Sequence, residues 1–413
     1  MLTGPRRQFK LLGRSPAFRL LFLSTLASNL GTWIAVIALT VDVYDRTHSG
    51  TWVSALLIAD FLPAVAIGLV LGPLVDRLDR KRLLIEADLV RCAVFVGLVF
   101  ATTPGQIVLL ALVAGFATGF FRPAAFAGLP NLVDDADLND ASSMLRSIEY
   151  VGSTVGTLIG GIVVAASGPH LGYWLNAASF LVSAVLIVGI AASLLQTEKA
   201  ESRGYLQDVR DGFSVVFNSR ALMAVFIAWN LVMLSNAGVN VAEVFLAKVS
   251  FNAGSFGYGL LWAGSGLGMV VGSLYASTWL EQRGISFVYA ASLGLMAFGT
   301  LTAALSPDVW VAALCLALAG SGNGSAVVCN ILLVQRGAPD NLRGRALTTL
   351  MSATFAVLGI GMAVWGPITN VAGARWVFGV CAFFAASAAV VGRVLTRGLA
   401  SAGEVDRAQP ASA

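Results

Sequence analysis

Three carboxyl groups within long apolar runs are candidates for proton coupling: Asp60, Glu243 and Glu149. Ionisable residues inside a membrane are costly and mark functional positions. A low-dielectric surrounding penalises the charged form of a carboxyl group, so such a group can take up and release a proton. We rank Asp60 first for proton coupling, because it lies deepest and has no basic residue within one turn. The alternatives are that Asp60 binds a neighbouring helix, or that the protein transports its substrate without ion coupling.

The other two carboxyl groups differ in their expected neighbours. Glu243 ranks second, because it shares a helical face with Asn236 and Asn240, whose amides can hold either protonation state. Glu149 ranks third, because Arg146 precedes it by three residues and is expected to pair with it and keep it ionised.

Amide and aromatic side chains recur at helical spacing within the apolar runs. Residues four or seven apart share a helical face, and a wall of such groups with few charges suits large amphipathic ligands. Hydrogen bonding between helices, or core packing, is the alternative for each residue. The candidates for a substrate cavity are Asn29, Trp33, Asn236, Asn240, Asn323 and Asn330.

No catalytic, metal or nucleotide site is expected. The four cysteines are scattered through apolar runs and the two histidines fall in predicted loops, whereas a catalytic metal needs clustered ligands. The phosphate-loop pattern G-x-x-x-x-G-K-[ST] is absent from the sequence. We therefore expect no catalytic residues, no metal, no cofactor and no ATPase subunit.

The composition predicts the elements that hold these residues. Of 413 residues, 57% are hydrophobic and 12% charged, and the mean hydropathy is +0.81. A soluble domain has about 25% charged residues, and a spanning helix needs about 20 apolar ones. We therefore expect an all-α polytopic membrane protein with twelve transmembrane helices, at 19–44, 51–75, 83–103, 105–128, 143–167, 171–195, 221–247, 256–280, 285–305, 308–335, 345–371 and 374–395.

Lysine and arginine predict the orientation. Of 26, only Arg46, Lys248 and Arg375 follow odd-numbered runs. Basic loops stay in the cytoplasm, so a multi-pass protein of the plasma membrane with both termini cytoplasmic is expected. Because the net charge of +4 follows this topology, no nucleic-acid partner is expected. The expected partners are the lipid bilayer and a small-molecule substrate, and we expect a monomer.

The two halves of the chain repeat each other. Gly72 and Gly272 are 200 residues apart in similar surroundings, and Trp174 and Trp376 are 202 apart. Such offsets predict two six-helix bundles in parallel orientation. The expected parts are a cytoplasmic tail at 1–18, a bundle at 19–195, a cytoplasmic connector at 196–220, a second bundle at 221–395 and a disordered cytoplasmic tail at 396–413.

A charged motif lies between the runs 51–75 and 83–103. The segment Gly72-Pro73-Leu74-Val75-Asp76-Arg77-Leu78-Asp79-Arg80-Lys81 resembles the signature G-x-L-x-D-R-x-G-R-[KR] of the major facilitator superfamily. Asp79 replaces the usual second glycine, which would stiffen the turn. A carboxylate here can face the positive end of another helix. The resemblance implies that this other helix is the run 345–371 and that the contact holds an inner gate closed. A solvated basic turn is the alternative. The gating candidates are Gly72, Asp76, Arg77, Arg80 and Lys81.

Small residues predict two places of close helix packing. Ala64, Gly68 and Gly72 form a ridge that we expect to face the run 345–371. In the run 143–167, Gly152-x-x-x-Gly156-Thr157-x-x-Gly160-Gly161 resembles the antiporter motif G-x-x-x-G-P-x-x-G-G. Thr157 replaces the proline, which weakens the antiporter inference, and simple packing is the alternative.

Further stretches narrow the resemblance. Phe121-Arg122-Pro123-Ala124, Leu175-Asn176-Ala177-Ala178-Ser179-Phe180 and Pro339 to Arg345 resemble the enterobactin-exporter and macrolide-efflux group. The resemblance implies that the runs 19–44, 105–128, 221–247 and 308–335 line a central cavity. Arg122 stands where that group often has an acid, and we expect it to meet Glu86, Asp88 or Asp76.

The resulting hypothesis is a secondary transporter that exports drug-like or siderophore-like molecules in exchange for protons by alternating access. Its direction and substrate follow from the resemblance alone. Uptake of a metabolite such as a sugar or an organic acid is the alternative within transport. A polytopic membrane enzyme or a non-transporting receptor is the alternative of another class; an enzyme should show a clustered catalytic set, which this sequence lacks.

Overall fold

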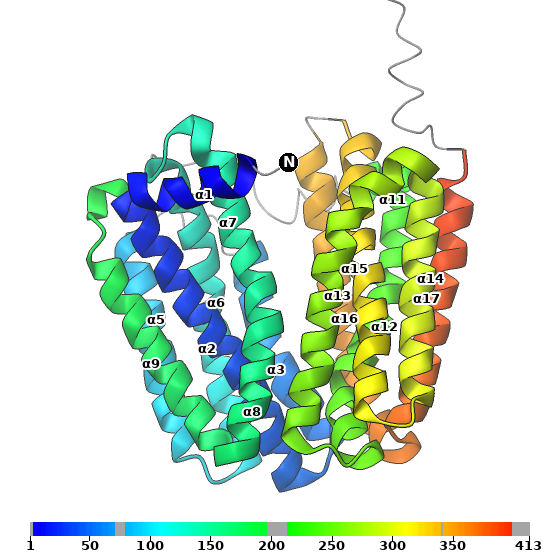
Figure 1. Ribbon diagram of the computed structural model, residues 1–413, viewed down its shortest axis with the longest axis horizontal. Helices are drawn as coiled ribbons and strands as arrows, with labels where there is room; N and C mark the ends of the chain where they lie inside the picture. The colour runs from blue at the N-terminus through cyan, green and yellow to red at the C-terminus, as the bar shows by residue number, and fades with distance from the viewer. Residues whose placement is uncertain (1–2, 71–78, 196–212, 340–341, 399–413) are drawn as a thin grey trace, which may run out of the picture. The chain divides into compact units, whose positions relative to one another are not determined.

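The computed structural model describes residues 3–70, 79–195, 213–339 and 342–398. These residues are almost entirely helical and include no strand (Figure 1). The chain divides into two compact units, Met1–Ser202 with Gly254–Gly259, and Arg203–Ala253 with Leu260–Ala413. Much of the expected connector, 196–212, and most of the expected C-terminal tail, 399–413, lie outside the described residues.

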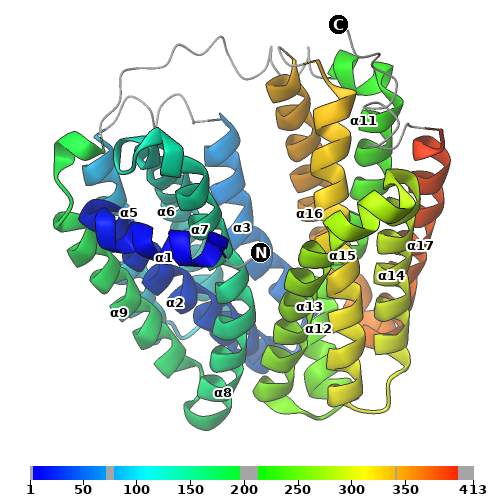
Figure 2. The same ribbon diagram turned by 45° about the horizontal axis from the view of Figure 1, so that its top comes forward.

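The first unit contains a short helix followed by membrane-length helices. α1 lies across the ends of the longer helices (Figures 1 and 2) and packs against α2 and α7; it occupies part of the expected tail at 1–18. The bounds are α1 Thr3–Arg14, α2 Pro16–Thr47, α3 Gly50–Val70, α5 Arg80–Val99, α6 Pro104–Gly128, η1 Leu129–Asn131, η2 Asp135–Asp137, α7 Leu138–Val151, η3 Gly152–Gly156, α8 Thr157–Ser167, α9 Pro169–Val188 and η4 Ala192–Leu194.

The second unit also consists mainly of membrane-length helices. After a helical stretch at 213–218, its elements are α11 Arg220–Ala224, η5 Val225–Trp229, α12 Asn230–Phe245, η6 Leu246–Ser250, α13 Gly254–Arg283, α14 Ile285–Leu305, α15 Val309–Gly337, α16 Arg343–Ala372 and α17 Ala374–Thr396. The segments η3, η5 and η6 are π-helical turns within longer helices.

Eleven helices of the described chain are long and apolar enough to cross a membrane. The expected count of twelve is therefore not confirmed. The third expected run, 83–103, corresponds to α5, which packs against α6 and α9. α5 is less apolar because it carries Arg80, Lys81, Arg82, Glu86, Asp88 and Arg91.

Local sequence explains where the helices begin and end. Ser15 accepts a hydrogen bond from the Phe18 amide at 3.2 Å and caps α2, and Asp308 caps α15 in the same way. Thr103 and Gln106 form a reciprocal capping box at α6. α2 ends where His48 adopts a left-handed conformation with φ 49°.

Glycines bring α6 onto α3 in the first unit. A Cβ atom at Gly119 would lie 2.8 Å from Ile67 Cβ and 2.9 Å from Ala64 Cα, and one at Gly115 would collide with the Asp60 carbonyl oxygen. Small residues allow such close approach in a membrane, where apolar burial does not drive helix association. The expected ridge on α3 therefore contacts α6 through Ala64. The expectation that the ridge faces the run 345–371 stays a prediction. Gly72 lies outside the described residues.

The second unit repeats this contact 205 positions later. Gly320 and Gly324 of α15 pack on the backbone of α13 at Ser265 and Met269, as Gly115 and Gly119 pack on α3 at Asp60 and Ala64. Ser325 Oγ also donates a 2.8 Å hydrogen bond to the Gly272 carbonyl. The two units thus contain an equivalent helix contact.

The packing of α6 on α3 gives a first prediction. Gly119→Val should destabilise the protein by about 1–3 kcal/mol, because the added carbons overlap the α3 backbone. Thermal unfolding of the purified protein in detergent measures the change. Gly294→Val in α14 is the matched control, because a Cβ atom there meets nothing within 4 Å. Equal melting temperatures for the two variants would contradict the prediction.

Candidate functional site

Two of the five gating candidates belong to the described residues. Gly72, Asp76 and Arg77 lie outside them. Arg80 is buried, and its Nη1 donates to the carbonyls of Ala127 at 3.2 Å and Leu195 at 3.3 Å.

Lys81 makes the same kind of contact. Its Nζ donates to the carbonyls of Val188 at 2.8 Å and Ile190 at 2.6 Å. The last carbonyls of a helix lack partners within it and favour cations. Arg80 and Lys81 therefore join the start of α5 to the ends of α6 and α9.

Asp79 has a structural role at the same place. Its carboxylate accepts a 3.0 Å hydrogen bond from the Arg82 amide and caps α5. Aspartate is a preferred N-cap residue, whereas glycine offers no side-chain acceptor. The departure from the superfamily signature thus supplies a helix cap.

The first two proton-coupling candidates have different surroundings. Asp60 is half-buried in α3, and its carboxylate has no hydrogen-bond or ion-pair partner among the described residues. Glu243 is only 3% exposed in α12, and its Oε1 has no partner within the described chain. Asn236 and Asn240 are half-buried on the same helix. Glu243 is therefore the more completely enclosed of the two acids.

Glu149 pairs with a residue of another helix. It forms an ion pair with Arg122 of α6, and the two side chains are 42% and 63% exposed. Arg146 instead extends over the Phe126 ring, 6.0 Å from its centroid. The expected pairing of Glu149 with Arg146 is therefore wrong, and Arg122 pairs with Glu149 rather than with Glu86 or Asp88. Asp76, the third expected partner of Arg122, lies outside the described residues. The contact between α6 and α7 brings the two charges together, which sequence spacing cannot reveal.

Asn29 and Trp33 meet the glycine motif of the expected run 143–167. A Cβ atom at Gly156 would lie 2.8 Å from Trp33 Cβ, and the nearest atom to one at Gly152 is Asn29 Oδ1. The Asn29 Oδ1 atom has no hydrogen-bond partner in the described structure. Two residues selected for a cavity and two selected for packing thus form one contact between α2 and η3.

The rest of this motif continues the contact. A Cβ atom at Gly160 would lie 3.0 Å from Ile34 Cα, and Gly161 is buried in α8. Gly152–Gly156 form the π-helical turn η3. Thr157, which replaces the proline of the resembled pattern, donates to the Ser153 carbonyl at 2.7 Å. The helix therefore departs from α geometry here without a proline.

Asn323 and Asn330 are half-buried in α15. The Oδ1 atom of each is buried without a hydrogen-bond partner in the described part of the chain, as is Oδ1 of Asn230. The glycines around Asn323 pack closely, since Gly322 contacts Ser292 of α14 while Gly320 contacts α13. These three amides of the second unit thus have an unused acceptor.

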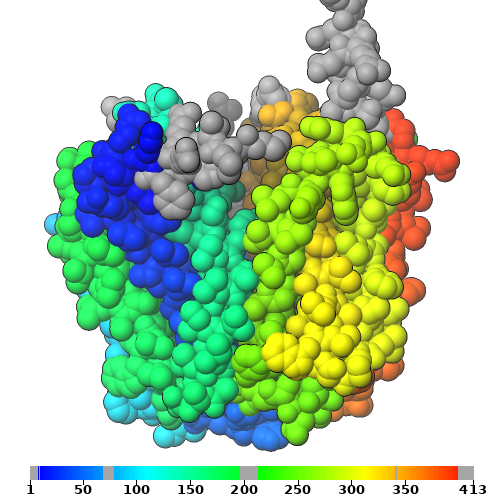
Figure 3. Space-filling view, in the orientation of Figure 1, coloured from blue at the N-terminus to red at the C-terminus, as the bar shows by residue number. Residues whose placement is uncertain are grey.

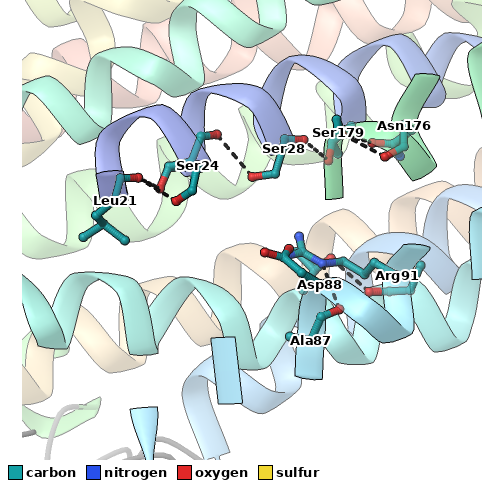
Figure 4. A network of polar contacts seen from close by, with 12 residues as sticks. Leu21, Ser24, Ser28, Ala87, Asp88, Arg91, Asn176 and Ser179 are labelled. Atoms are coloured by element: carbon teal, nitrogen blue, oxygen red, sulfur yellow. Dashed lines mark hydrogen bonds and ion pairs between the residues drawn. The ribbon is translucent and has the colours of Figure 1, made fainter. Parts of the chain in front are cut away.

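A buried ion pair in the first unit was not anticipated. Asp88 and Arg91 of α5 pair with both side chains almost fully buried (Figure 4). The Arg91 guanidinium lies between two rings, 4.4 Å from the Phe121 centroid and 4.3 Å from the Phe180 centroid. An Asp and an Arg three residues apart in an apolar helix were the signal for the pair. Phe121 and Phe180 belong to the stretches 121–124 and 175–180, which resemble the enterobactin-exporter and macrolide-efflux group.

The stretch 175–180 of α9 also contacts α2. A Cβ atom at Gly31 would lie 2.6 Å from Asn176 Oδ1 and 2.7 Å from Ser179 Cβ. Ser179 Oγ donates to the Asn176 carbonyl at 2.8 Å, and Figure 4 shows both residues beside the serines of α2. The stretch 175–180 therefore packs α9 against both α2 and α5.

A second buried network was also missed. Asp42 accepts hydrogen bonds from Arg46 Nε at 2.7 Å and from the Tyr173 hydroxyl at 2.8 Å, and Arg46 Nη1 donates to the Thr102 carbonyl at 3.0 Å. Tyr173 is fully buried. The network ties α2 to α9 and to the turn before α6.

Membrane-length helices in two units, with few charges in the apolar stretches, define a polytopic membrane protein. The chain belongs to the transmembrane secretion effector family of the major facilitator superfamily, whose model matches residues 12–409. It is therefore a membrane protein of the transporter class.

Curated relatives are of similar length. The chain is 27% identical over 363 residues to the enterobactin exporter EntS of Salmonella typhimurium (strain LT2), covering 85% of this chain and 86% of that one. It is 26% identical over 387 residues to the multidrug efflux pump Tap of Mycolicibacterium fortuitum, covering 88% and 92%. It is 25% identical to the uncharacterized MFS-type transporter YfiS of Bacillus subtilis (strain 168), covering 87% and 88%.

Solved transporters share the fold. The peptide transporter POT superposes with a TM-score of 0.76 at 13% identity, covering 92% of this chain and 94% of that one. The nucleoside transporter NupG superposes with a TM-score of 0.69 at 16% identity, covering 92% and 98%.

The buried pair in α5 gives a second prediction. Asp88→Asn should lower stability by about 3–5 kcal/mol, because it leaves the Arg91 charge buried and unpaired. The measurement is the melting temperature of the purified protein. Glu86→Gln is the control, since Glu86 is exposed on the same helix. The double variant Asp88→Asn/Arg91→Met should recover part of the loss. A wild-type melting temperature for Asp88→Asn would refute this role.

Proposed function

We propose that the protein is a secondary active exporter of drug-like or siderophore-like small molecules, driven by the proton gradient through alternating access. The observation that carries the proposal is the enclosed carboxyl group of Glu243, which has an unpartnered oxygen and no described ion pair. The efflux proteins among the relatives support the direction of transport. In this proposal the protein is a non-enzymatic monomer without cofactor, nucleic-acid partner or ATPase subunit, and its termini are cytoplasmic.

Glu243 suits proton exchange better than the other acids. A carboxyl group buried without a cation is stable only as the neutral acid, so it must bind a proton whenever it is enclosed. Asp60 is less enclosed, and Glu149 is ion-paired with Arg122. We therefore place Glu243 first as the proton carrier and keep Asp60 second.

The remaining roles follow the same proposal. Asn236 and Asn240 precede Glu243 by seven and three residues on α12, and in this proposal their amides bind it in either protonation state. Asp76, Arg77, Arg80 and Lys81 form the proposed inner gate. The proposed ligand-facing amides and ring are Asn29, Trp33, Asn236, Asn240, Asn323 and Asn330.

Transport in liposomes tests the proposal. A growth screen of a deletion strain, with and without an uncoupler, first identifies an exported compound. Purified Glu243→Gln should then fail to drive uphill movement of that compound under an imposed pH gradient. It should still exchange labelled for unlabelled compound, because glutamine resembles the protonated acid in shape.

The control is Glu281→Gln, which changes an exposed acid at the end of α13 and should transport like the wild type. The same liposome assay of Asp60→Asn tests Asp60, the second candidate for the proton carrier. If Glu243→Gln and Asp60→Asn both sustain wild-type uphill transport, proton coupling through either residue is wrong.

A further inference from the structure

One face of α7 is polar and exposed although α7 belongs to the membrane-length stretch Asp135–Ser167. Ala141, Met144, Leu145 and Ile148 bury the opposite face. The polar face consists of Ser143, Arg146 and Ser147, which are exposed, and of Glu149 and Tyr150, which are half-buried. Figure 3 shows α7, in teal, at the surface of the first unit.

The ion pair of Arg122 and Glu149 lies well inside these helices. Arg122 is six residues before the end of α6, and Glu149 is eleven residues after the start of α7. At a rise of 1.5 Å per residue these positions are about 9 and about 16 Å from the helix ends that the loop 129–137 joins. Charged groups exposed at this depth must face water, because lipid does not solvate them. This surface, which we call the α6–α7 wall, is therefore an aqueous one.

The α6–α7 wall carries a net positive charge. Among the described residues, two guanidinium groups, Arg122 and Arg146, accompany one carboxylate, Glu149. The acids of the segment 134–140 lie at the start of α7, more than two helical turns from Glu149, and Asp137 pairs with Arg14 at 3.4 Å. Among other charges of α5, Arg91 pairs with Asp88, while Arg80 and Lys81 bind backbone carbonyls.

We propose that the α6–α7 wall binds the anionic group of a substrate, with Arg122 exchanging Glu149 for that group. The inference rests on the proposed transport function and adds a substrate class, molecules with a carboxylate or a similar planar anion. A guanidinium group matches a planar carboxylate with two parallel hydrogen bonds. An exposed ion pair adds little net stability, so a ligand anion can replace Glu149 at small cost. Glu149 holds Arg122 in position while the wall is empty.

Arg146 supports the same site. Its guanidinium lies over the Phe126 ring, a contact that holds a cation at the wall without neutralising it. Tyr150 is half-buried one residue after Glu149 and adds a hydroxyl group and an aromatic ring. The α6–α7 wall thus combines cationic groups, which can bind the carboxylate of an aromatic acid, with aromatic groups, which can contact its ring.

Equilibrium binding to the purified full-length protein, without any proton gradient, tests the site. The probes are salicylate and salicylamide, which have the same ring but differ in charge. Salicylate should bind saturably to the wild type, and Arg122→Gln should weaken this binding by about tenfold or more, because a charge-assisted hydrogen-bonded pair is lost. Arg122→Lys should show an intermediate loss, and Glu149→Gln should tighten salicylate binding by removing the competing carboxylate. Binding of salicylamide should change with none of these variants.

Arg283→Gln is the matched control, because Arg283 is also an exposed arginine over a phenylalanine ring, 5.6 Å from the Phe287 centroid. Its salicylate binding should equal that of the wild type, and melting temperatures confirm that each variant is folded. Equal salicylate affinity in wild type and Arg122→Gln, or no saturable salicylate binding by the wild type, overturns the proposal. Because no gradient is applied, that result leaves proton-driven export standing. Loss of export with intact salicylate binding would instead count against the transport proposal alone.

Discussion

A polar side chain inside a membrane must find a partner, face water or be neutral, and this constraint separates the acids of the described chain. Asp88 has a partner, the guanidinium of Arg91 between two phenylalanine rings. Glu149 is exposed together with its partner Arg122, and we infer that the pair faces water. Glu243 has neither a cation nor exposure, so neutrality is its remaining stable form. We propose that Asp88 has a structural role, that Glu149 belongs to a ligand-binding surface and that Glu243 exchanges a proton.

Close helix packing keeps these environments distinct. Within each unit, glycines on one helix contact the backbone of another, at Gly115 and Gly119 in α6 and at Gly320 and Gly324 in α15. The same kind of contact joins α2 to η3 and α8 through Gly156 and Gly160. Such contacts leave no room between the helices, so polar groups are enclosed between specific neighbours rather than hydrated along the whole helix.

The sequence predicted the helical membrane fold and the family, because hydropathy, the internal repeat and the motifs are local or periodic signals. It failed where a contact between helices decides the partner. Arg146 is one turn from Glu149, yet Arg122 of another helix forms the pair. The contact of Ala64 with Gly119 of α6 was not predicted for the same reason, since a small-residue ridge does not specify what it contacts. α5 is also absent from the eleven helices that qualify as spans, because its apolar stretch holds too many charged residues.

The central claim is that the enclosed Glu243 is a neutral acid that exchanges a proton. The most direct measurement is the infrared spectrum of the purified protein in lipid at neutral pH, in the region of the carboxylic-acid C=O stretch. The account predicts an acid band in the wild type that disappears in Glu243→Gln and persists in Glu149→Gln. An identical band in wild type and Glu243→Gln would contradict it.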